Sequence, residues 1–220
     1  MCGNRRAIFK GVRLLWFVIL GCCFLLVLPR PWTERILAEN GPIEMPTAIA
    51  YFVAAMMLWF SSPHRRWHAE IPGTVLLIAA GLRELDFQAR FTTGYAFSSR
   101  FFLQASTPII QKISVAAVLL FLGSMFALLV AHNWRRFLRA FQAREIWAQS
   151  FALSVSLIFI STALDEMGGF LRRHYPSATD CMFIMWVFEE SLEALIPVLF
   201  ATAIVQAAAA VPAIERRQAA

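Results

Sequence analysis

The chain has 220 residues, of which 59% are hydrophobic and only 15% are charged, and its mean hydropathy is +0.62. A soluble domain usually carries about a quarter charged residues, so this composition excludes an ordinary soluble protein. Apolar runs of nearly twenty residues recur, and they are continuous rather than alternating, which excludes a membrane β-barrel. We therefore predict an all-α polytopic transmembrane helix bundle that forms a single integral membrane domain over residues 1–220.

The apolar runs predict six spans. The first has the basic flank of a signal peptide, but it continues into Pro29 without a small-residue cleavage site, which indicates a retained signal anchor. Pro46, Pro72 and Pro108 each come at the start of a later run, where the first helical turn tolerates a missing N–H. The expected spans cover about 13–28, 46–61, 71–91, 108–131, 146–168 and 181–207.

Lysine and arginine are divided unevenly between the connections of these spans. The side that holds both termini has 12 of them and the opposite side has 6. Excess positive charge marks the cytoplasmic side, so we expect both termini in the cytoplasm and a bacterial inner (plasma) membrane location. The net charge of +6 is then explained by orientation and contact with membrane lipids rather than by nucleic acid. An oligomer or a partner subunit stays open.

The acidic residues show the opposite asymmetry. Eleven of the 14 fall in the outer loops or in the outer halves of the spans. The rule that orients membrane proteins concerns Lys and Arg and does not require this distribution. The eleven are Glu34, Glu39, Glu44, Glu84, Asp86, Asp165, Glu166, Asp180, Glu189, Glu190 and Glu193.

The third and sixth spans carry carboxylates inside the expected hydrocarbon region. If residues 71–91 form one helix, Arg83, Asp86 and Arg90 share an arc and Glu84 must find its partner on another helix. In the sixth span Glu189 and Glu193 stack four residues apart, with Glu190 to the side, and Pro197 frees the carbonyl of Glu193. A charge in hydrocarbon is costly, so we expect Glu84 close to Glu189 or Glu193.

The fifth span adds a polar stripe and an acid near the outer boundary. Ser150, Ser154, Ser161 and Asp165 fall on one helical face, and His174 follows in the next loop. Small hydroxyl residues are typical of close helix packing, which we favour over a polar pathway. Pairing of the acids with Arg83, Arg90, Lys112, Arg172 and Arg173 is the structural alternative for the whole set.

Three functions follow from these residues. The first is an enzyme that acts on a lipid or lipid-linked substrate with a hard divalent cation, Mg²⁺ or Mn²⁺, on oxygen ligands. The second is a small-solute transporter coupled to protons or cations, and the third is a scaffold subunit. The predicted catalytic residues are Glu84, Glu189 and Glu193, the substrate-binding residues Arg83, Arg90 and Arg172, and the metal ligands Glu189, Glu193, Asp165 and His174.

Known motifs do not decide between these functions. Glu189-Glu190 is similar to the start of the EExxxR signature of CAAX-type intramembrane proteases, but position 194 is Ala instead of Arg. His64 and His68 stand four apart in a basic connection, where contact with lipid headgroups is the simpler interpretation. The aromatic segment 91–102 predicts an interfacial anchor rather than a lid.

Overall fold

The computed structural model of the protein describes residues 21, 23–38, 41–61, 67–92 and 99–218, which are mostly helical and include no strand. The helices are α2 (Arg30–Ile36), α3 (Glu44–Phe60), α4 (Trp67–Glu84), η1 (Phe87–Arg90), α5 (Ser99–Leu103), α6 (Ile109–Gln142), α7 (Ile146–His174) and α8 (Thr179–Gln218). The all-α prediction is confirmed. The predicted first span, 13–28, falls mostly outside the described residues.

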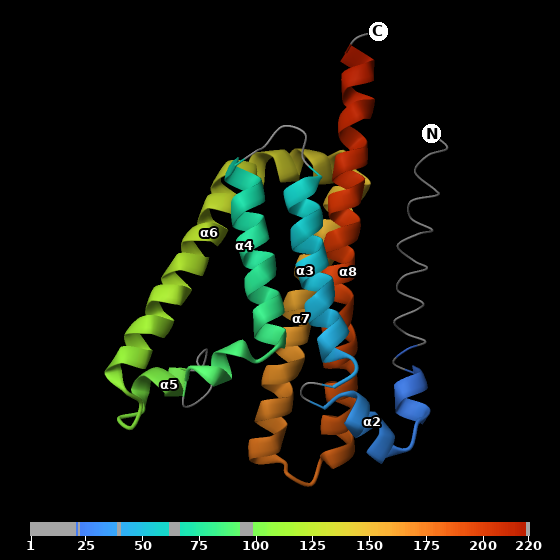
Figure 1. Ribbon diagram of the computed structural model, residues 1–220. Helices are drawn as coiled ribbons and strands as arrows, with labels where there is room; N and C mark the ends of the chain where they lie inside the picture. The colour runs from blue at the N-terminus through green and yellow to red at the C-terminus, as the bar shows by residue number, and fades with distance from the viewer. Residues whose placement is uncertain (1–20, 22, 39–40, 62–66, 93–98, 219–220) are drawn as a thin grey trace.

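Three helices are long and apolar enough to cross a membrane, namely Ile109–Gln142, Ile146–His174 and Thr179–Ala210. The helix α3 is apolar but shorter, with 17 residues. Consecutive long helices run up and down (Figure 1), so the α6–α7 turn and the end of α8 lie at one end of the bundle. The α7–α8 turn, the start of α3 and the end of α4 lie at the opposite end, near α2.

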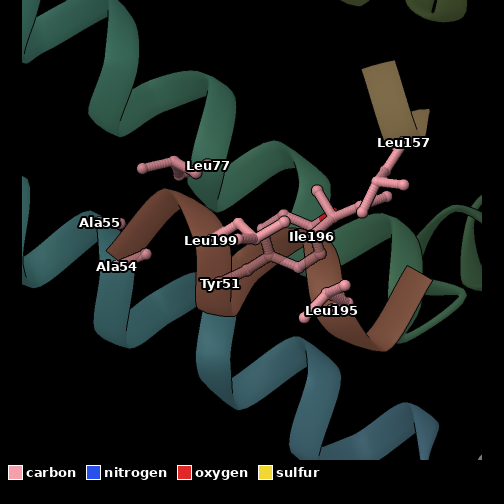
Figure 2. Close-up of a cluster of buried hydrophobic side chains, with 8 residues drawn as sticks. All are labelled: Tyr51, Ala54, Ala55, Leu77, Leu157, Leu195, Ile196 and Leu199. Carbon is pink, nitrogen blue, oxygen red and sulfur yellow. The ribbon is translucent and has the colours of Figure 1, made fainter. Parts of the chain in front are cut away.

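The core forms where α3, α4, α7 and α8 meet. Figure 2 shows the side chains that fill it, and Ala54 and Ala55 let α3 approach α8 closely. The helix α6 leans away from this group (Figure 1), and most of its large apolar side chains are exposed, as lipid-facing side chains are. The buried core consists of Tyr51, Ala54, Ala55, Leu77, Leu157, Leu195, Ile196 and Leu199.

Two glycines bring α3 and α4 into contact. A Cβ at Gly81 would lie 3.1 Å from the Phe52 ring and 3.2 Å from the Ala48 carbonyl oxygen, and one at Gly73 would lie 2.7 Å from Leu58. The end of α4 is therefore held so close to α3 that a Cβ at position 81 would require its neighbours to move. This contact positions Glu84, which lies three residues beyond Gly81.

The prediction of one helix over 71–91 is wrong in its outer part. The helix α4 begins at Trp67 and ends at Glu84, and Asp86 adopts a left-handed conformation with φ of 45°. Aspartate tolerates this conformation better than most residues because its short polar side chain bonds locally. Arg83, Asp86 and Arg90 therefore do not share a helical face, since Arg90 belongs to the separate 3-10 helix η1.

Pro72 lies inside α4 and not in its first turn, which corrects a second expectation. A proline at this position cannot donate to the carbonyl of His68. The Asn133 side chain of α6 donates to that carbonyl at 3.4 Å, and the His68 ring stacks on His132 with centroids 4.4 Å apart. The His68 carbonyl, which lacks its usual donor within α4, thus joins α4 to α6. His64, the other predicted histidine of this region, lies outside the described residues.

Candidate functional site

Glu193 on α8 is the centre of the polar contacts inside the bundle. Its Oε1 accepts a hydrogen bond from Ser161 Oγ of α7 at 2.7 Å and lies 3.5 Å from Arg83 Nη2 of α4. The Glu193 side chain is 16% exposed, whereas that of Arg83 is 58% exposed. The ion pair therefore has one enclosed and one exposed partner, and Ser161 holds the enclosed one.

Glu84 joins this centre from the end of α4. It is only 9% exposed, and it interacts electrostatically most strongly with Glu193, then with Arg83 and Glu190. Tyr51 of α3, buried in the core, interacts with both Glu84 and Glu193. The structure therefore brings Glu84 to the carboxylates of the sixth predicted span, as the cost of burying it led us to expect.

Glu189 and Glu190 extend the site on two sides of α8. Glu189 interacts most strongly with Asp165 of α7. Glu190 accepts a hydrogen bond from Trp186 Nε1 at 3.0 Å and interacts with Glu44 of α3. We call the acids that these interactions join the carboxylate cluster. Its members are Glu44, Glu84, Asp165, Glu189, Glu190 and Glu193.

The charges of the carboxylate cluster are not balanced. Among the described residues, Arg83 is the one cation that these electrostatic interactions include. Four of these carboxylates, those of Glu84, Glu189, Glu190 and Glu193, are buried or half-buried around one guanidinium, and they cannot all be charged without a large electrostatic penalty. The ion pair with Arg83 joins Glu193 alone among these four acids, so structural pairing with Arg83 does not account for the set.

The cluster is separated from the opposite half of the bundle by the hydrophobic core. On α8 the next two turns after Glu193 bring Leu195, Ile196 and Leu199 into that core. Beyond it, Ser150 Oγ donates to Gln206 Oε1 at 2.9 Å. The two polar layers between α7 and α8 thus have an apolar layer between them.

The serine stripe of α7 includes a packing residue and a direct partner of the carboxylate cluster. Ser154 is fully buried and donates to the Ser150 carbonyl, as a packing residue does. Ser161 is also buried but donates to Glu193 instead. The sequence placed Ser161 on the correct face and missed its role as a direct partner of the cluster.

His174, a predicted metal ligand, lies apart from Glu193. His174 stacks on Phe170 at the end of α7 and contacts its carbonyl oxygen. It is 13 residues beyond Ser161, which is about 20 Å along a helix axis. Arg172, in the same last turn, and Arg90, in η1, are both exposed.

The predicted metal ligands come together only in part. Asp165 and Glu189 interact, as do Glu189 and Glu193, but His174 lies elsewhere. Within the described ranges, no three His, Cys, Asp or Glu side chains lie close enough together to hold a metal ion. The metal site stays a prediction.

Tyr51 and Glu44 were not predicted as site residues. Tyr51 lies in a predicted apolar helix with no polar pattern, and Glu44 precedes the predicted span 46–61, in a predicted loop. Both enter the site because α3 packs between α4 and α8, which no local pattern specifies.

Crosslinking tests the assembly of the site. Cysteines that replace Glu84 and Glu193 in a chain without its native cysteines are expected to join efficiently through a short bismaleimide, since α4 and α8 meet through Arg83 and Glu193. A pair at 84 and 174 is the matched control and should not join. Equal yields from both pairs would contradict the described site.

No protein-family model, curated protein or solved structure matches this chain.

Proposed function

We propose that the protein is a membrane transporter in which the carboxylate cluster binds a proton or cation and couples its movement to that of a small solute. The observation that carries this proposal is the excess of acids over Arg83 within the bundle. Such a cluster gains stability when a proton or cation neutralises one of its members. Exchange of that ion is the simplest chemistry available to it.

The position of the cluster supports coupled transport. Glu193 is followed by the buried Pro197, whose missing N–H leaves the Glu193 carbonyl without its usual helical donor. Transporters place their ion sites at such interruptions near the middle of the membrane. The apolar layer formed by Leu195, Ile196 and Leu199 provides the barrier that alternating access requires.

The membrane arrangement proposed with this function has six spans with both termini in the cytoplasm. The helices α3 and α4 have 17 and 18 residues, or about 26 Å of helix each, which approaches the thickness of the hydrocarbon layer. In this arrangement the carboxylate cluster opens to the outer leaflet. A bacterial inner membrane is the proposed location.

Reporter fusions test this topology. Fusions near residues 64, 138 and 218 are expected to report a cytoplasmic position, and fusions near 38, 98 and 175 a periplasmic one, because Lys and Arg concentrate on the first side. Two exchanged assignments would overturn the orientation and the outward opening of the cluster.

Ion flux in proteoliposomes tests the proposed function. The purified protein is expected to collapse an imposed pH gradient, or to carry a monovalent cation, at a rate well above that of empty liposomes. The matched control is Glu166→Gln, which changes an exposed carboxylate of α7 outside the cluster. Flux no faster than in empty liposomes, across a panel of ions and solutes, would reject the transporter.

A lipid-directed enzyme is the second candidate, and the open guanidinium of Arg83 favours it. Arg83 is 58% exposed beside Glu193, and a guanidinium in this position suits the phosphate of a lipid headgroup. In this function Glu84 is the base, Glu189 and Glu193 bind Mg²⁺ or Mn²⁺, and Arg90 or Arg172 assists with the substrate. Turnover of a lipid phosphate that depends on either cation would favour this candidate.

A further inference from the structure

The segment before α3 docks on the outer end of α8. Leu25 and Leu37 are buried against Val187 of α8, and Phe183 and Trp186 pack around them. Thr33, fully buried, donates to the Leu25 carbonyl at 2.8 Å, which ties α2 to the residues before it. Figure 1 shows α2 beside this end of α8, on the side where the α7–α8 turn lies.

Arg30 fastens this segment to α8 with several contacts. Its Nη1 lies 3.1 Å from Asp180 Oδ1, and its Nη2 donates to the Thr179 carbonyl at 3.4 Å. Its guanidinium carbon lies 4.8 Å from the centroid of the Phe183 ring, and its Nε reaches Glu34 at 3.3 Å. One side chain thus joins α2 to the first two turns of α8.

The ion pair between Arg30 and Asp180 is exposed and can break reversibly. The side chains of Arg30 and Asp180 are 46% and 90% exposed. Ion pairs as exposed as this contribute little to stability and are weakened by salt. The ionic part of the contact is therefore specific in geometry but weak, and the apolar group of Leu25, Leu37 and Val187 supplies the rest of the attachment.

Trp186 connects this contact to the carboxylate cluster. Its ring packs in the same apolar group as Leu25, Leu37 and Val187. Its Nε1 donates to Glu190 Oε1 at 3.0 Å, and Glu190 interacts with Glu193 and Glu44. The tryptophan therefore belongs to the apolar group that holds the docked segment and also donates to the carboxylate cluster.

We propose that α2 is an outer latch, held by Arg30, that controls aqueous access to the carboxylate cluster through Trp186. With the latch closed, Trp186 covers Glu190 and holds its oxygen. When Arg30 releases Asp180, the apolar group loosens, Trp186 loses its packing and the outer side of the cluster becomes hydrated. This inference rests on the proposed outward opening of the cluster, and it adds what regulates that opening.

Labelling with a water-soluble carbodiimide and an amine nucleophile tests the latch. The rate of modification at Glu190, measured by peptide mass spectrometry relative to exposed Glu166, is expected to rise about fivefold or more in Arg30→Ala and in Asp180→Asn. Arg35→Ala, on the same helix but outside the Arg30 contacts, is the control and should stay within about twofold of the wild type. Raising the salt concentration should increase labelling in the wild type and not in Arg30→Ala.

Two further variants test the route through Trp186. Trp186→Phe is expected to raise Glu190 labelling by itself, and adding Arg30→Ala should then increase it no further, because both changes open the same contact. Cysteines at 30 and 180, in a chain without its native cysteines and joined by a short bismaleimide, should keep labelling at or below the wild-type rate in high salt.

The proposal is overturned if Arg30→Ala leaves labelling within about twofold of the wild type, if Arg35→Ala raises it equally, or if the effects of Arg30→Ala and Trp186→Phe multiply. Melting temperatures of the Arg30 and Asp180 variants should match that of the wild type, because the altered ion pair is exposed. If the labelling results contradict the latch while ion flux is intact, only the latch proposal is rejected. If labelling responds as the latch predicts but neither the wild type nor any variant shows ion flux, only the transporter proposal is rejected.

Discussion

Replacing Glu193 with Gln is expected to reduce ion flux at least about a hundredfold while the protein still inserts and folds. Gln keeps an acceptor for Ser161, which donates to Glu193 Oε1 at 2.7 Å. It also removes one of four buried or half-buried acids, so the electrostatic penalty within the cluster falls. Arg83 is 58% exposed and can be rehydrated once its partner is neutral. The melting temperature in detergent should therefore stay level or rise, as it does where strained polar groups serve function.

The structural alternative makes the opposite prediction for the same variant. If Glu193 only neutralises Arg83, loss of its charge should lower the melting temperature, and Arg83→Gln should restore it. Glu166→Gln controls for the general effect of removing a carboxylate. Destabilisation by Glu193→Gln with rescue by the second change would mean that the acids hold the bundle together and do not form a working site.

Replacing Gly81 with Leu is expected to be the most destabilising single change at the α3–α4 contact. A Cβ alone would lie 3.1 Å from the Phe52 ring and 3.2 Å from the Ala48 carbonyl, and a backbone oxygen on α3 moves only if the whole helix moves. Overpacking of this kind costs about 1–3 kcal/mol and sometimes more. The change should also disturb flux, because Glu84 lies one turn further along α4.

Gly123→Leu on α6 is the matched control, since no heavy atom lies within 4 Å of a Cβ at that position. The melting temperature in detergent should fall strongly in Gly81→Leu, less in Gly81→Ala, and hardly at all in Gly123→Leu. Equal melting temperatures for the two leucine variants would contradict the close contact of α3 with α4.

Much of the fold could be predicted from hydropathy, because lipid requires long apolar segments with internally satisfied backbones. That reasoning placed α6, α7 and α8, although α6 and α7 continue to Gln142 and His174, beyond the apolar runs. It failed at the end of α4, since Asp86 interrupts the helix through its backbone conformation, which side-chain periodicity does not report.

The candidate site was predictable only where helical spacing defines neighbours. Glu189 and Glu193 share a face by their spacing, and the cost of burying Glu84 required a partner from another span. Ser161, Tyr51 and Glu44 could not be assigned, because their roles depend on how α3 and α7 pack against α8. His174 and Arg172 were included for their nearness in sequence, but the last turns of α7 carry them away from Glu193.

The most direct measurement of the central claim is labelling by a hydrophobic carbodiimide, which reacts with protonated carboxyls in apolar surroundings. If the carboxylate cluster binds protons or cations, peptide mass spectrometry should find the label on Glu84, Glu189 or Glu193, and the transported cation or high pH should protect these residues. Glu166, exposed on α7, should not show this protection. Absence of label from the whole cluster, or labelling unaffected by pH and by every cation, would contradict an ion-binding site.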